Sequence, residues 1–160
     1  MFKKRSLSAA CVFLVAATGQ SALSTNEAPS NNVAPIGLDR NVIRGVGLEP
    51  IAPYKTELTV SGLQKLSAHE LFSGAFTIDV WETQDGGRLL LKDYPFDQYV
   101  QVLHGSTTLT SNAGSSRSFV AGDSFVVPRG FKGTWTLSKG FREILIIESK
   151  TLKEGIGQFE

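Results

Sequence analysis

Cysteine is almost absent from this chain: Cys11 is the only one among 160 residues, beside one methionine and two histidines. Because Cys11 lies in a leader segment that we expect to be removed, the mature chain would offer no thiol nucleophile, disulfide or zinc–thiolate site. Basic residues are not in excess either, since the formal net charge is +1. The basic residues near the C-terminus alternate with apolar ones, which excludes the basic stripe that nucleic-acid-binding proteins use.

The first 24 residues have the three-part design of a secretory signal peptide. Lys3–Arg5 precede the apolar run Ala9–Ala17, and small residues follow at Ser21–Ser24. The run is shorter than the roughly 20 apolar residues that cross a bilayer as a helix, which argues against the alternative of a membrane anchor. We therefore expect cleavage after Ala22 or Ser24, a secreted or periplasmic location, and no membrane association once the leader is removed.

Residues 25–54 are rich in Asn, Pro and Gly and show no sustained period, so they are predicted to form a partly ordered N-terminal arm. Aliphatic residues of this arm, among them Val42, Ile43 and Ile51, would dock on the following domain or on a partner subunit. The alternative is a linker in which these apolar residues are incidental.

Residues 55–150 are predicted to form one all-β domain, followed by a C-terminal tail over 151–160. Phe76, Ile78 and Val80 alternate with Thr77 and Asp79, which is typical of a strand with one buried face. Short strands are predicted over 56–60, 75–82, 88–92, 94–103, 106–110, 117–120, 125–127, 133–137 and 143–148. Strands at this spacing, separated by turns, favour a jelly roll.

Two further segments have a distinct pattern. The continuous apolar run Ile144–Ile147 predicts a strand that is covered on both faces. Residues 63–72 are the only weak candidate for a helix.

A turn-rich segment near residue 130 matches the second motif of the cupin superfamily, G-x5-P-x-G-x2-H-x3-N. Gly122, Pro128 and Gly130 lie at the motif intervals, whereas Gly133 and Leu137 occupy the histidine and asparagine positions. The chain thus resembles a cupin, and the resemblance implies an RmlC-like double-stranded β-helix, that is, a jelly-roll barrel.

Residues 75–147 resemble, more closely, the small single-domain cupins of the (S)-ureidoglycine aminohydrolase-like family. The residues that match are Trp81, Gly105, Gly122, Asp123, Pro128, Gly130, Gly133 and Trp135. Family resemblance is a safer guide to fold than to activity, because one fold supports many functions.

The first cupin motif, counted back from Gly105, lacks its metal ligands. Gln98 takes the glutamate position, and Lys92 and Tyr94 take the two histidine positions. Divalent metals require imidazole nitrogens or ionised carboxylates as donors, so we expect no bound metal and no cofactor. The two histidines, His69 and His104, are predicted to be structural or surface residues.

The resemblance implies that Lys92, Tyr94, Gln98 and Trp135 converge on the barrel cavity. Gly133 would leave open the space that a histidine fills in other cupins. Lys92, if buried, would act as a base or bind a carboxylate; the alternative is a solvent-exposed lysine at the strand edge.

Aromatic and basic residues complete the predicted site. Trp135 and Trp81 offer flat walls for a planar ligand, or else fill the core. Arg129 projects from the turn at the barrel mouth and would meet an anionic ligand, unless it is an ordinary exposed arginine.

Three functions are compatible with these residues. The first is an exported cupin that binds a small polar metabolite in its barrel without a metal. The second is a small-molecule hydrolase, isomerase or lyase of the ureidoglycine aminohydrolase-like type, with Lys92 or Tyr94 as acid or base. The third is a structural module that forms a homodimer through its sheets.

Overall fold

The computed structural model describes residues 33–159. The chain divides after Pro35, and the residues from Ile36 onward form one compact unit, to which the description below refers. The predicted signal peptide, residues 1–24, lies outside the described residues. Neither α-helix in the described range has the length and apolar character needed to cross a membrane.

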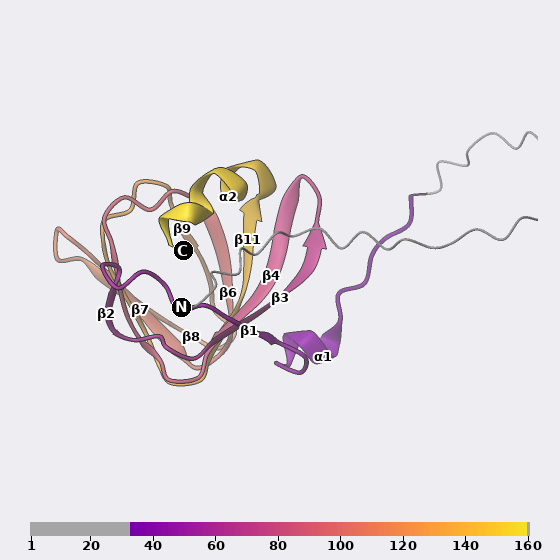
Figure 1. Cartoon of the computed structure of the whole chain (residues 1–160), viewed down its shortest axis with the longest axis horizontal. Helices are drawn as coiled ribbons and strands as arrows, with labels where there is room; N and C mark the ends of the chain where they lie inside the picture. The colour runs from indigo at the N-terminus through magenta and orange to yellow at the C-terminus, as the bar shows by residue number, and fades with distance from the viewer. Residues whose placement is uncertain (1–32, 160) are drawn as a thin grey trace, which may run out of the picture. The chain divides into compact units, whose positions relative to one another are not determined.

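The unit is built mainly of β-strands (Figure 1). Its strands are β1 (Glu49–Ile51), β2 (Thr59–Gly62), β3 (Leu66–Ser73), β4 (Phe76–Thr83), β5 (Gly87–Leu91), β6 (Gln98–His104), β7 (Ser106–Ser111), β8 (Ser116–Val120), β9 (Ser124–Val127), β10 (Gly133–Leu137) and β11 (Phe141–Glu148). Its helices are α1 (Arg40–Ile43), α2 (Ser149–Gly155) and the 3-10 helix η1 (Ile156–Gln158).

The strands form two antiparallel sheets. The six-stranded sheet has the order β1-β3-β4-β11-β6-β9, and the five-stranded sheet has the order β2-β5-β10-β7-β8. Figure 1 shows β3, β4 and β11 on one side of the unit and β2 and β7 on the other. The predicted all-β fold, the double-stranded β-helix of the cupins, is confirmed.

Strand β3 occupies most of the segment that was a weak helix candidate, so that prediction is wrong. The strand pairs with β4 from Leu66↔Thr83 to Ser73↔Thr77, and with β1 along its other edge. Hydrogen bonding to two neighbours and burial of Leu66 in the core override the local helical pattern, as tertiary context often does for weak propensities.

Strand β4 is covered on both faces, whereas its alternation predicted one buried face. Val80 and Ile78 pack in an outer cluster with Val42 of α1 and Ile144 of β11. Trp81 points the other way, into the main core between the sheets. The run at Ile144–Ile147 is likewise covered on both sides, as predicted, because Ile144 joins the outer cluster and Ile147 the main core.

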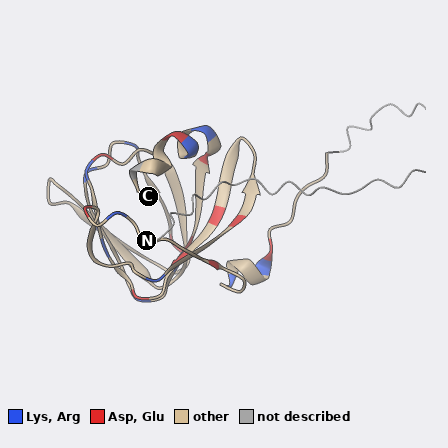
Figure 2. Ribbon diagram, viewed as in Figure 1, with Lys and Arg blue, Asp and Glu red and all other residues tan. Residues whose placement is uncertain are grey.

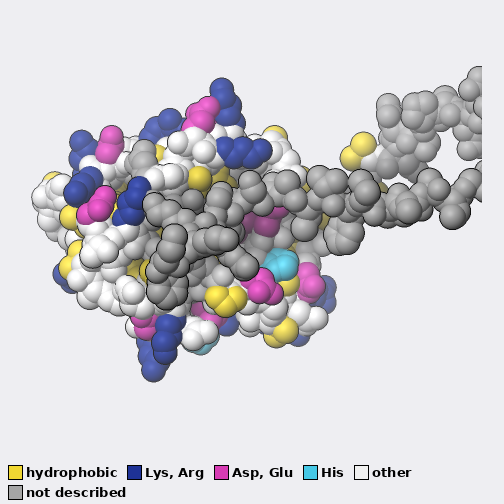
Figure 3. All heavy atoms as spheres, viewed as in Figure 1, with side chains coloured by type: hydrophobic (Ala, Val, Ile, Leu, Met, Phe, Trp, Pro, Cys, Tyr) yellow, Lys and Arg dark blue, Asp and Glu magenta, His cyan; other side chains and the backbone are white. Residues whose placement is uncertain are grey.

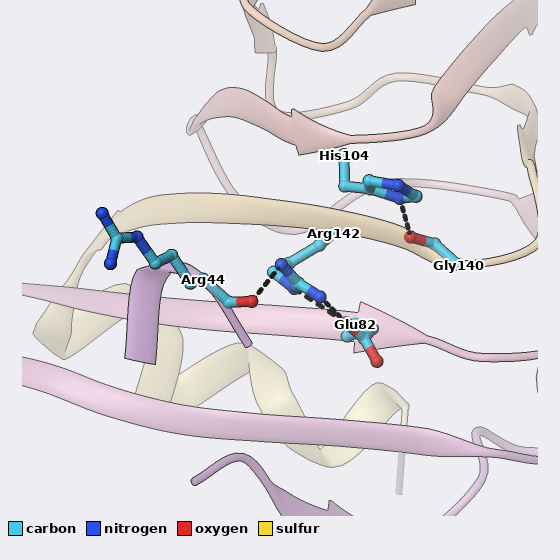
Figure 4. A network of polar contacts seen from close by, with 5 residues as sticks. All are labelled: Arg44, Glu82, His104, Gly140 and Arg142. Carbon is cyan, nitrogen blue, oxygen red and sulfur yellow. Dashed lines mark hydrogen bonds and ion pairs between the residues drawn. The ribbon is translucent and has the colours of Figure 1, made fainter. Parts of the chain in front are cut away.

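The segment around α1 docks on the outer face of the six-stranded sheet, which is one of the two alternatives for the N-terminal arm. Arg142 of β11 holds it there (Figure 4): the guanidinium Nε and Nη2 lie 2.7 Å and 2.6 Å from Glu82 Oε2, and Nη1 donates to the carbonyl oxygen of Arg44 at 2.6 Å. A Cβ atom on Gly45 would lie 2.3 Å from Arg142 Nη2, so the backbone here approaches the guanidinium as only glycine permits.

The C-terminal segment, predicted as a tail, folds back onto the domain. The side chain of Phe159 is buried in the main core. Lys55, just before β2, donates from its backbone N–H to the carbonyl oxygen of Phe159 at 2.9 Å and from Nζ to that of Gly157 at 2.7 Å. Residues about a hundred positions apart are therefore joined at one end of the barrel.

Gly133 does not leave open space, contrary to the prediction from the motif. A Cβ atom there would lie 2.1 Å from the carbonyl oxygen of Thr110 and 2.9 Å from Ser111 Cα on the neighbouring strand β7. The glycine is required by this close approach of β10 to β7.

Gly133→Ala is therefore expected to destabilise the fold by about 1–3 kcal/mol, the usual cost of overpacking. Urea unfolding followed by circular dichroism measures the change. Gly37→Ala is the matched control, since nothing lies within 4 Å of the Cβ position at Gly37. Equal stability of the two variants would contradict this account of Gly133.

Candidate functional site

A cavity of about 50 Å³ lies between the two sheets. Its lining combines polar, aromatic and aliphatic side chains: Tyr54, Trp81, Leu89, Leu91, Tyr94, Gln98, Trp135, Leu137, Glu143, Leu145 and Phe159. At on the order of 10–15 Å³ for each water centre, this space holds a few waters or one very small molecule.

Glu143 carries the one carboxyl group among the cavity-lining residues. It lies on the inner face of β11 and only 3% of its surface is exposed. Its Oε1 accepts a hydrogen bond from Gln98 Nε2 at 3.3 Å, and Gln98 Oε1 accepts one from the hydroxyl of Tyr94. A chain of hydrogen bonds thus leads from the loop after β5, through β6, to the carboxyl group on β11.

Two buried polar atoms at the cavity have no hydrogen-bond partner in the described part of the chain: Glu143 Oε2 and Trp81 Nε1. The two residues are directly opposite each other on the paired strands β11 and β4, so their side chains are neighbours on one face. The indole of Trp135, by contrast, donates to Thr107 Oγ1 at 2.6 Å. Buried polar groups are nearly always paired, and an unpaired one is costly. These two atoms are therefore available to a bound molecule or to water.

The cavity disfavours the ionised form of Glu143. Burial raises the pKa of Glu143 to about 8, and the hydrogen bond from Gln98 opposes part of that rise. Burial, and then the proximity of Glu143, also raise the pKa values of Tyr54 and Tyr94. At neutral pH the free cavity is consequently uncharged, with Glu143 protonated.

Aromatic rings form most of the remaining wall. Tyr54 and Trp81 stack with ring centroids 6.1 Å apart and an interplanar angle of 7°. Phe159 meets Tyr54 at 62° and Tyr94 at 74°, and Tyr94 meets Trp135 at 77°. We call these five residues, Tyr54, Trp81, Tyr94, Trp135 and Phe159, the aromatic cage, because their steep mutual angles place rings on several sides of one space.

Four of the six predicted site residues line this cavity together: Trp81, Tyr94, Gln98 and Trp135. Lys92 does not, and the expectation that it points into the cavity is wrong. Strand β5 ends at Leu91, which faces inward, so the next side chain points to solvent and is exposed. Lys92 instead lines a separate cleft of about 170 Å³ with Glu57 and Asp93. The burial that would have made it a base is absent.

Arg129 also lies away from the cavity. It is exposed, its backbone N–H donates to Asp97 Oδ1 at 2.9 Å, and its Nη2 donates to Thr151 Oγ1 of α2 at 3.4 Å. Along the ribbon of the described residues, Lys and Arg positions are interspersed with Asp and Glu positions (Figure 2).

Besides the aliphatic lining, sequence reasoning missed three polar or aromatic cavity residues: Glu143, Tyr54 and Phe159. Glu143 directly precedes an apolar run and faces inward at a position that the cupin motifs do not mark. Its signal was its alternation with Leu145, two positions on, since both line the cavity. Tyr54 and Phe159 come from the two ends of the domain, and no local pattern connects them.

The donor set at the cavity does not fit the metal that many cupins bind. The lining offers one carboxyl group and no imidazole, whereas such sites need several nitrogen or carboxylate donors. His69 and His104 are exposed on β3 and β6, and His104 Nδ1 lies 2.8 Å from the carbonyl oxygen of Gly140 (Figure 4). Within residues 33–159 no group of three or more His, Cys, Asp and Glu side chains is placed to hold a metal ion.

The two antiparallel sheets with a cavity between them are typical of the cupin double-stranded β-helix. The family model described as the EutQ-like cupin domain matches residues 70–144. The chain thus has the cupin fold, and a little under half of it is similar to the EutQ-like cupin domain. The matched range includes Trp81, Gln98 and Glu143, but Tyr54 and Phe159 lie outside it.

Solved structures agree on the fold. A protein of unknown function from Pseudomonas syringae pv. tomato is 21% identical with a TM-score of 0.57, and the match covers 62% of this chain and 43% of that one. The polyketide cyclase RemF from Streptomyces resistomycificus is 15% identical with a TM-score of 0.51, and the match covers 64% of this chain and 75% of that one. This chain therefore spans less than half of the Pseudomonas protein. No curated protein matches it.

Glu143→Gln is expected to reduce the loss of stability that accompanies rising pH. Wild-type Glu143 stays protonated in the folded state up to about pH 8 but ionises in the unfolded state above its ordinary pKa of 4.5. The folded state binds the extra proton between these values, so the free energy of unfolding falls by up to about 1.4 kcal/mol per pH unit. Urea unfolding at a series of pH values measures this slope.

The slopes of the variant and the wild type are best compared above about pH 6.5. Below that pH Asp79 also titrates in the folded state, because burial raises its pKa to about 6. Glu49→Gln, at an exposed position on β1, is the control and should keep the wild-type slope. A Glu143→Gln variant with that same slope would show that the carboxyl is not protonated in the folded protein.

Proposed function

We propose that the barrel of this protein binds a small polar molecule, and that the protein is a metabolite-binding cupin that does not use the usual cupin metal ligands. The observation that carries the proposal is a pair of unpartnered buried atoms, Glu143 Oε2 and Trp81 Nε1, on neighbouring residues that line the same cavity. Pockets that bind small molecules combine apolar and aromatic walls with a few convergent polar groups, and this cavity has that composition.

The size of the cavity limits the ligand. The cavity of about 50 Å³ and the neighbouring cleft of about 170 Å³ share Leu91, Tyr94 and Phe159 as walls. A ligand of a few heavy atoms fits the cavity as it is. A longer one requires a shared wall residue to move so that the two spaces join.

A second candidate function is acid–base catalysis. A buried carboxyl group with a pKa of about 8 at the wall of a cavity is suited to donate or accept a proton near neutral pH. This keeps open the hydrolase, isomerase or lyase alternative of the ureidoglycine aminohydrolase-like type, with Glu143 in place of Lys92. An enzyme of this kind would turn over a retained molecule, with a rate that changes near pH 8 in the wild type and is lost in Glu143→Gln.

Native mass spectrometry of gently purified protein tests the binding proposal. The native mass should exceed the denatured mass by that of a small molecule, and the excess should be lost in Glu143→Gln and in Trp81→Phe. Glu49→Gln should retain it. A wild-type protein without any retained molecule, and without a thermal shift in a library of small metabolites, would refute the proposal.

We also propose, from the sequence, that the protein is exported and forms a homodimer. The same spectra report both properties, because they give the subunit number and, for protein from the native host, the mass after leader removal. Where described residues are visible in Figure 3, hydrophobic side chains form only small separate groups among the charged ones.

A further inference from the structure

We propose that the molecule held in the barrel is a small organic cation, an amine in its ammonium form, with its charge against Glu143 and its carbon atoms against the aromatic cage. This inference rests on the proposed binding function and names its ligand class.

The aromatic cage supplies the first argument. Cations are attracted to the faces of Trp, Tyr and Phe rings, and cages of several rings recognise alkylated ammonium groups. Here rings from five separate parts of the chain line one cavity. The angles of 62°, 74° and 77° between neighbouring rings show that these rings do not form a single stack, so they contribute walls of different orientation to the cavity that they line.

Glu143 supplies the second argument. Its unpartnered Oε2 can accept a hydrogen bond from an ammonium group while Oε1 keeps the one from Gln98 Nε2. No lysine, arginine or histidine is among the lining residues of the cavity. Lys92, the nearest basic candidate from the sequence, is exposed in the neighbouring cleft. An anion in the cavity would therefore meet ring faces and a carboxyl group without any positive charge to balance it.

Trp81 Nε1 adds a requirement. The indole N–H is a donor that an ammonium group cannot satisfy. A ligand that also carries an oxygen acceptor would pair with it, and a water molecule would do so beside a simple amine.

Binding of a cation is coupled to loss of a proton. Glu143 is protonated in the free cavity at neutral pH and must ionise to pair with the ligand. The groups that face it are Gln98 and Val102 of β6, Trp81 of β4 and the hydroxyls of Tyr54 and Tyr94, of which only the tyrosines titrate, and their pKa values are raised. Asp79 lies two residues from Trp81 along β4, outside the lining. The affinity for a cation should therefore rise roughly tenfold per pH unit up to about pH 8 and then level off.

Intrinsic fluorescence provides a direct measurement, because the chain has two tryptophans and both line the cavity. The full-length protein is titrated with methylammonium, with methanol as a neutral molecule of the same number of heavy atoms, and with formate as an anion, at about pH 6, 7, 8 and 9. Saturation-transfer NMR repeats the measurement independently of fluorescence. We expect methylammonium to bind more tightly than the other two, with the pH dependence given above.

Two variants test separately how the Glu143 carboxylate and the aromatic cage contribute to the affinity. Glu143→Gln should lose at least tenfold in methylammonium affinity and all of its pH dependence, while Glu49→Gln behaves as the wild type. Phe159→Leu, which keeps an apolar side chain and removes a ring, should weaken methylammonium several-fold and leave methanol unchanged. A purely structural role of Phe159 would weaken both probes alike.

The outcomes distinguish the two proposals. Tighter binding of methanol or formate than of methylammonium, or an affinity that falls with rising pH, would overturn the cation inference and leave the binding function in place. Absence of binding by all three probes, together with no retained molecule in native mass spectrometry, would overturn both.

Discussion

Pairing of β11 along both of its edges is the constraint on which the rest of the structure depends. The strand pairs with β4 from Phe141↔Thr83 to Glu148↔Phe76, and with β6 along the opposite edge. Because side chains alternate along a strand, this register directs Glu143 into the barrel and Arg142 to the outer face. One strand therefore provides both the acid of the cavity and the guanidinium that holds the segment around α1.

The sequence predicted the barrel better than it predicted the cavity. Turn residues at motif intervals, such as Gly122, Pro128 and Gly130, mark strand ends locally, and the fold followed from them. Tyr94, Gln98 and Trp135 were found because the motif positions coincide with inward-facing positions. Lys92 was misplaced because Leu91, the last residue of β5, takes the inward-facing position, and the next side chain points to solvent.

What could not be predicted depends on long-range pairing. Glu143 faces the cavity only because β11 pairs with β4 in the observed register, and a shift of one residue would turn it outward. Phe159 reaches the cavity because Lys55 binds the carbonyl oxygens of the last turn. Neither the register of β11 nor the contacts of Lys55 can be predicted from a pattern of neighbouring residues. The family match covers 70–144, so the two cage residues outside it, Tyr54 and Phe159, add to the common barrel a wall that is particular to the flanking segments.

The buried acid links stability and binding through one proton. In the free protein this proton neutralises Glu143, and the folded state benefits from it until the pH approaches about 8. A cationic ligand favours the opposite protonation state, since it pairs with the ionised carboxylate. Rising pH therefore lowers the stability of the ligand-free protein through this residue. Over the same pH range it raises the affinity for a cation. By linkage, a bound cation offsets the loss of stability that the free protein suffers as Glu143 ionises. The residue that lowers the stability of the free protein at alkaline pH is therefore the one that a cationic ligand stabilises.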